Sequence, residues 1–145
     1  FSTNDRLRKD AYEILYRAID TEDYALVYGD SHLTAVPHES FDNHSAREKF
    51  QWPPYSRDVL LQNCMIGPHP MWRKTLHEKI GYFDDSYDAI GDQEFWCRIA
   101  LHYDMHHVDE VTGLFWATTD SLSGNSEVSN REIARYRQKY ASFVA

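Results

Sequence analysis

Basic residues are scarce in this chain, and their scarcity narrows the range of its partners. The 145 residues include 15 Lys and Arg against 23 Asp and Glu, which gives a formal net charge of -8. Proteins that bind nucleic acid draw much of their affinity from clustered Lys and Arg that neutralise phosphates. The charge balance therefore argues against nucleic acid as a partner, and it disfavours other acidic partners unless a metal bridges to them.

Cysteines and long apolar runs are also scarce. Cys64 and Cys97 lie far apart without the spacing of a zinc knuckle or a disulfide framework, which indicates free thiols in a reducing compartment. No apolar run approaches the roughly 20 residues that cross a bilayer, and residues 1–6 lack the charged and apolar regions of a signal peptide. We therefore expect no transmembrane segment and a cytoplasmic location.

Aromatic residues, by contrast, are abundant. They make up 14% of the chain and include ten Tyr and four Trp. Large rings commonly fill a hydrophobic core, and they can also offer flat surfaces on which sugars stack. The composition leaves both interpretations open.

The order of apolar patterns predicts one α/β domain over residues 1–145. Strand-like runs fall at 24–30 and within 105–118, where Gly113 marks an expected break, and the stretch 32–55 reads as a long irregular excursion. Helical spacing and helix end signals predict helices over 6–20, 56–63, 73–80, 92–103 and 130–143.

Two acids near the start of the 92–103 helix are the strongest candidates for chemistry. An acid at that position faces the positive end of the helix dipole, and the turn-forming loop 82–87 brings Asp92 to an edge of the domain. A carboxylate that is partly desolvated in a cleft binds protons more readily and can serve as a general base. Glu94 is two residues away and cannot share a helix face with Asp92. The alternative is that Asp92 only caps the helix.

Other candidates rest on shorter signals. His69 lies between two prolines that stiffen the segment 64–72. Asn4 and Asp5 lie at a predicted strand-to-helix junction, where α/β sheets bind ligands and where a carboxylate could hold a divalent cation or merely cap the helix. His106 and His107 are adjacent on a predicted strand, so their side chains point to opposite faces and are poorly placed to share one ion.

Residues 80–85 (IGYFDD) and 91–98 (GDQEFWCR) closely match the pattern "iGyFDe.y.a.gDwEfwlRia". This pattern is that of family 2 glycosyltransferases of the GT-A fold, which the chain resembles most specifically over residues 65–123. Further similarity to the family is found at 4–7 (NDRL), 26–30 (LVYGD), 107–110 (HVDE), 113–115 (GLF) and 120–123 (DSLS).

For the fold, the resemblance implies a partial GT-A type domain with a mixed sheet flanked by helices. The chain would be the C-terminal part of a glycosyltransferase catalytic domain, and the N-terminal half that binds the nucleotide would precede Phe1. We expect such a fragment to bind sugar nucleotide poorly by itself. A sheet edge left uncovered by the missing half would favour pairing between copies.

For the function, the resemblance implies transfer of a sugar, with inversion, from a nucleoside-diphosphate-sugar donor to a saccharide hydroxyl, as in polysaccharide and cell wall biosynthesis. Asp92 matches the family's catalytic base. We expect Glu94 to bind substrate and to help orient the acceptor or the base, and His69 and Trp72 to line the acceptor side. The family's acidic motif implies a divalent cation, Mg or Mn, held here by Asp5, the one carboxylate in residues 2–5.

Two other functions fit the same residues. The chain could be a noncatalytic carbohydrate-binding or interaction module, in which aromatic rings stack on sugar and the acids only cap helices. It could also be a metal hydrolase built on the histidines, which would carry tightly bound zinc.

Overall fold

The computed structural model of the chain describes residues 5–116 and 127–145. Its helices are α1 (Ala11–Thr21), α2 (Arg57–Leu60), α3 (Leu76–Ile80), α4 (Gly91–Ala100) and α6 (Glu127–Tyr140), which is followed by the 3-10 turn η1 (Ala141–Phe143). Its strands are β1 (Arg6–Leu7), β2 (Leu26–Thr34), β3 (Glu48–Phe50), β4 (Met71–Trp72) and β5 (Met105–Trp116). This arrangement confirms the expected α/β fold with a mixed open sheet flanked by helices.

Strands β2 and β5 form the centre of the sheet. They run parallel, from the pairing of Leu26 with Met105 to the pairing of Thr34 with Trp116. On the outer side of β5 lies β1, which is antiparallel to it. Strands β3 and β4 are both antiparallel to β2 and pair with its C-terminal and N-terminal parts respectively. The sheet is therefore mixed.

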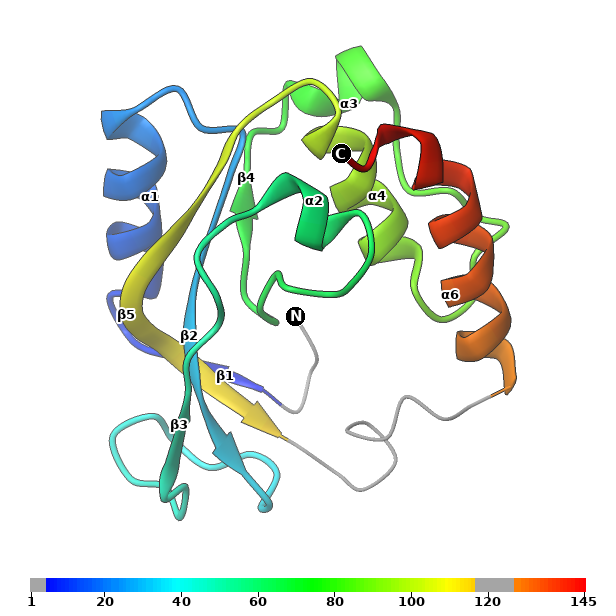
Figure 1. The fold of residues 1–145 in the computed structure, drawn as a ribbon. Helices are drawn as coiled ribbons and strands as arrows, with labels where there is room; N and C mark the ends of the chain where they lie inside the picture. The colour runs from blue at the N-terminus through cyan, green and yellow to red at the C-terminus, as the bar shows by residue number, and fades with distance from the viewer. Residues whose placement is uncertain (1–4, 117–126) are drawn as a thin grey trace.

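Helices cover both faces of this sheet (Figure 1). Helix α1 packs on one face through Leu15 and Ile19, which contact Val27 of β2. On the other face, α2, α3 and α4 enclose the largest cluster of buried side chains, which includes Tyr28 and Phe95. Helix α6 lies outside α4 (Figure 1), and a third cluster joins the two helices. Helix α4 is thus packed between the sheet and α6.

Several predicted element boundaries are wrong. The first helix begins at Ala11 rather than at residue 6, because Arg6 and Leu7 pair with β5 as a short strand. Strand β2 continues to Thr34, and β3 lies within the stretch expected to be irregular. Short strands of this kind are set by their partners in the sheet, so their own sequence gives little signal. Asn4 and the 120–123 motif lie outside the described residues.

Strand β5 is not interrupted at Gly113, where the sequence indicated a break. Gly113 pairs with both Leu7 and Ser31, and the irregularity in register lies instead opposite Asp30. A side chain at Gly113 would place its Cβ 2.7 Å from the His69 ring. The glycine therefore serves close packing against His69 rather than a turn.

The helices in the described part of the chain are short or amphipathic. In residues 5–116 and 127–145, no helix has the length and apolar character needed to cross a membrane.

The central strand pair gives a test of the packing at Gly29 in β2. A Cβ at this position would lie 2.6 Å from Thr112 Cγ2 and 2.9 Å from the Glu110 carbonyl oxygen. We expect Gly29→Ala to lower the free energy of unfolding by about 1–3 kcal/mol, since the backbone of β5 cannot yield cheaply. Denaturant titration measures the change.

The matched control for this substitution is Gly91→Ala, in the first turn of α4. Its Cβ would meet the nearest atom at 3.6 Å, an ordinary contact. Alanine also favours a helix by up to about 1 kcal/mol over glycine. Equal destabilisation by the two substitutions would contradict the described fit between β2 and β5.

Candidate functional site

A cavity of about 380 Å³ lies where β5 ends and α4 begins. It brings together four residues that the sequence singled out, Asp5, His69, Trp72 and Asp92, from three separate parts of the chain. The full lining consists of Asp5, Gly67, Pro68, His69, Pro70, Trp72, Phe83, Asp92, Trp96 and Phe115. We call it the acid-lined cavity.

Asp92 is the second residue of α4. Its Oδ1 accepts a hydrogen bond from the backbone N–H of Gln93 at 2.7 Å. Burial raises the pKa of the Asp92 carboxyl above its ordinary value, although backbone hydrogen bonds from Gln93 and from Asp92 itself oppose the shift. The residue is nevertheless exposed to solvent at the mouth of the site. A carboxylate that is accessible and partly desolvated suits a general base.

Asp92 also lines a second, adjacent cavity of about 400 Å³, which we call the α6-side cavity because side chains of α6 form part of its wall. Gly67, Pro68 and Phe115 line both cavities. The other lining residues of the second cavity are Trp52, Asn63, Cys64, Ile66, Ala89, Ile90, Gln93, Ile133, Tyr136 and Arg137. One carboxylate therefore lies at the junction of two neighbouring hollows.

Asp5 and His69 form the buried side of the acid-lined cavity. The Asp5 residue is only 2% exposed, and its Oδ1 accepts the backbone N–H of Trp116 at 3.0 Å. Its Oδ2 lies 3.4 Å from His69 Nε2. Through these contacts Asp5 joins the end of β5 to the proline-flanked segment that carries His69.

The described residues around Asp5 do not form a donor set that fits a divalent cation. Both carboxylate oxygens face protein partners, and Mg or Mn prefers several oxygen ligands. Among residues 5–116 and 127–145, no group of three or more His, Cys, Asp or Glu is arranged to hold a metal ion.

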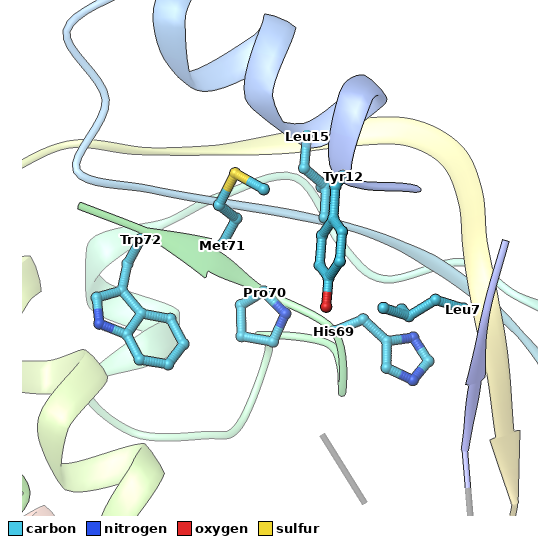
Figure 2. A pocket seen from close by; sticks show the side chains of 7 residues that line it. All are labelled: Leu7, Tyr12, Leu15, His69, Pro70, Met71 and Trp72. Atoms are coloured by element: carbon cyan, nitrogen blue, oxygen red, sulfur yellow. The ribbon is translucent and has the colours of Figure 1, made fainter. Parts of the chain in front are cut away.

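The segment from His69 to Trp72 separates the acid-lined cavity from a smaller apolar one of about 230 Å³, lined also by Leu7, Tyr12 and Leu15. Figure 2 shows these side chains, with the Tyr12 ring reaching from α1 toward Pro70 and His69. On the other side, the Trp72 ring meets the Trp96 ring edge-on, with centroids 5.1 Å apart. The segment is therefore a shared wall fixed by packing on both sides.

Glu94 does not lie in either cavity lining. It is 0% exposed and points between α4 and α6. Its Oε1 accepts hydrogen bonds from Tyr140 Oη at 2.7 Å and Lys139 Nζ at 2.9 Å, and its Oε2 accepts one from Arg98 Nε at 3.0 Å. As the spacing predicted, Asp92 and Glu94 lie on different faces of the helix. The structure gives Glu94 a bracing position rather than the expected contact with substrate.

The adjacent histidines of β5 have different surroundings. The His106 ring stacks on Tyr24, with centroids 4.8 Å apart. His107 Nε2 lies 2.7 Å from Oδ1 of the buried Asp30, which also accepts the backbone N–H of Trp52 at 2.9 Å. His107 and Asp30 thus link the two central strands.

Sequence reasoning missed several lining residues. Trp96 lies four residues after Asp92 on α4, so helical periodicity could have identified it. Phe83 belongs to the loop 82–87 of the family pattern, yet nothing in the pattern shows that it lines the same cavity as Asp92. Phe115 reaches the cavity from the far end of β5, and no local signal predicts this approach.

No protein-family model matches this chain, and no curated protein matches it either. The resemblance to glycosyltransferases therefore rests on the residue patterns themselves.

The position of Glu94 predicts a structural effect when its charge is removed. We expect Glu94→Gln to lower the free energy of unfolding by about 1.5–3 kcal/mol, because charge-assisted hydrogen bonds to a buried carboxylate are lost. Thermal or urea unfolding measures the change.

The matched control is Glu13→Gln on α1. Glu13 also pairs with an arginine four residues later, Arg17, but both side chains are exposed. Exposed pairs of this kind contribute about 0.3–0.5 kcal/mol. If the two substitutions cost the same, the brace between α4 and α6 is not significant for stability.

Proposed function

We propose that this chain is the C-terminal part of a GT-A type catalytic domain, and that it moves a sugar with inversion from a nucleoside-diphosphate-sugar donor to a saccharide hydroxyl. One observation carries the proposal: Asp92, the acid within the best-matched motif, lines both of two adjacent cavities. A general base that serves two bound substrates needs such a position, since it must reach the acceptor hydroxyl close to the donor's reacting carbon.

The proposed reaction is a single displacement. The Asp92 carboxylate takes the proton of the acceptor hydroxyl as the hydroxyl oxygen forms a bond to the anomeric carbon. The bond from that carbon to the diphosphate oxygen breaks on the opposite side, and the nucleoside diphosphate leaves with the bonding electrons. The new glycosidic bond therefore has inverted configuration. The raised pKa of Asp92 strengthens it as a base compared with an ordinary Asp.

The other lining residues fit a sugar substrate. Trp72, Phe83 and Phe115 provide aromatic surfaces on the walls around Asp92. Aromatic rings stack on the apolar faces of sugars, and polar groups at the rim can orient the hydroxyls. We infer that His69 and Trp72 act on the acceptor side as part of the wall.

A divalent cation and a cytoplasmic location remain expectations from the sequence and its resemblance. Because the described residues around Asp5 do not form a cation site, the proposed mechanism takes no step through a metal.

The test replaces the proposed base. We expect Asp92→Asn to lower kcat by at least about 100-fold, the usual scale of general-base catalysis, while donor binding is retained. The assay follows nucleoside diphosphate release from a panel of UDP- and GDP-linked sugars with oligosaccharide acceptors. It uses the protein as encoded, including any residues upstream of Phe1.

The control for this test is Asp85→Asn, an exposed acid of the preceding loop, which should keep normal turnover. The melting temperature of Asp92→Asn should not fall, because a neutral amide avoids the desolvation of the carboxylate. If turnover survives in Asp92→Asn, Asp92 is not the base. Saccharide binding without any transfer by the unaltered protein would favour the noncatalytic module.

The same proposal predicts how the rate depends on pH. A base must be ionised, so kcat/KM should fall as pH drops through the Asp92 pKa, at a pH above the ordinary value for Asp. The other titratable or charged groups that line the two cavities are Asp5, His69, Cys64, Tyr136 and Arg137. The fall in kcat/KM at low pH should persist in His69→Gln and should be absent from the residual activity of Asp92→Asn. If the same fall in kcat/KM at low pH remains in Asp92→Asn, a group other than Asp92 causes it.

A further inference from the structure

Helix α6 directs one buried carboxylate at the loop that precedes α4. Glu132 is only 7% exposed. Its oxygens accept the backbone N–H groups of three consecutive residues: Asp88 at 3.1 Å, Ala89 at 2.9 Å and Ile90 at 3.3 Å. A side chain from a distant part of the sequence thus binds three neighbouring amides at once.

These amides lie at the start of the helix that carries the proposed base. Ile90 occupies the N-cap position of α4 and has no side chain that can accept a hydrogen bond. Amides at a helix N-terminus lack partners within the helix, and a negative charge there also interacts favourably with the helix dipole. From α6, Glu132 supplies a negative charge near this terminus and a partner for one of these amides, that of Ile90, and Asp92 follows only two residues after Ile90.

Other contacts of α6 hold the same loop. The Arg135 guanidinium lies 4.1 Å from the centre of the Tyr87 ring, and its Nη2 donates to Ser86 Oγ at 2.8 Å. Ala89 and Ile90 then form part of the α6-side cavity together with Ile133 of α6. The position of the loop therefore decides both the direction of Asp92 and the shape of this cavity.

We propose that Glu132 is a positioning residue for Asp92, which it fixes at the junction of the two cavities by binding the amides of Asp88, Ala89 and Ile90. This inference rests on the proposed function. Helix α6 then contributes to the site through Glu132, although Glu132 lines neither cavity.

The test substitutes Glu132→Gln, which keeps the shape of the side chain and removes its charge. We expect amide hydrogen exchange at Asp88, Ala89 and Ile90 to accelerate at least about tenfold, the scale of a lost charge-assisted hydrogen bond. In the nucleoside diphosphate release assay, kcat should fall by about tenfold or more with little change in KM, since a displaced base weakens the chemical step more than binding. The control is Glu127→Gln, an exposed acid in the first turn of the same helix, which should change neither measurement.

The exchange data and the kinetics separate the possible failures. Unchanged exchange at the three amides would show that Glu132 does not hold them. Faster exchange with unchanged kcat would show that Glu132 does not position Asp92. Failure of the proposed function appears instead as full turnover in Asp92→Asn, which leaves the exchange result unaffected. If Glu132→Gln does not fold, Glu132→Asp, with a shorter carboxylate of the same charge, is tested with the same expectations. In the unaltered protein, unprotected exchange at all three amides would by itself overturn the proposal.

Discussion

Strands β2 and β5 pair in parallel through the centre of the sheet, and the other elements take their positions from this pair. Parallel neighbours cannot be joined by a tight turn, so the chain between them must cross over one face. Here the crossover includes α2, α3 and α4. The C-terminal end of helix α4 leads into the start of β5. The N-terminal end of α4 therefore lies near the C-terminal end of β5, and there Asp92 and Phe115 line the same cavity. The contact of 2.7 Å between His107 Nε2 and Oδ1 of the buried Asp30 also links the central pair.

Three carboxylates around α4 differ in their surroundings, which favour a structural role for two of them and a chemical role for the third. Glu94 is fully buried but is bonded to two cations and a hydroxyl, and Glu132 is bonded to three amides. Buried charges are tolerated when they are satisfied in this way. Asp92 accepts a hydrogen bond from the backbone N–H of Gln93 and is accessible from two cavities. The satisfied acids therefore stabilise the helix, and the accessible one is available for proton transfer.

Local patterns in the sequence predicted the α/β class, the core of β2 and the helix that follows the loop 82–87, since each depends on neighbouring residues. Gly81 directly follows the helix predicted over 73–80, and it has a positive φ of 84° at the end of α3, where glycine is favoured. The errors fall where a distant partner overrides the local pattern. Arg6 and Leu7 fit a helical spacing, but pairing with β5 makes them a strand.

The sequence alone determined that Asp92 and Glu94 point in different directions, because helix geometry fixes the faces of residues two apart. Only the tertiary structure decided which acid meets the cavities and which is enclosed by α6. It also brought Asp5 to His69 and Glu132 to the loop before α4. These approaches join residues far apart in the chain through strand pairing and helix packing, and such long-range contacts leave no periodic signal in the segments that they connect.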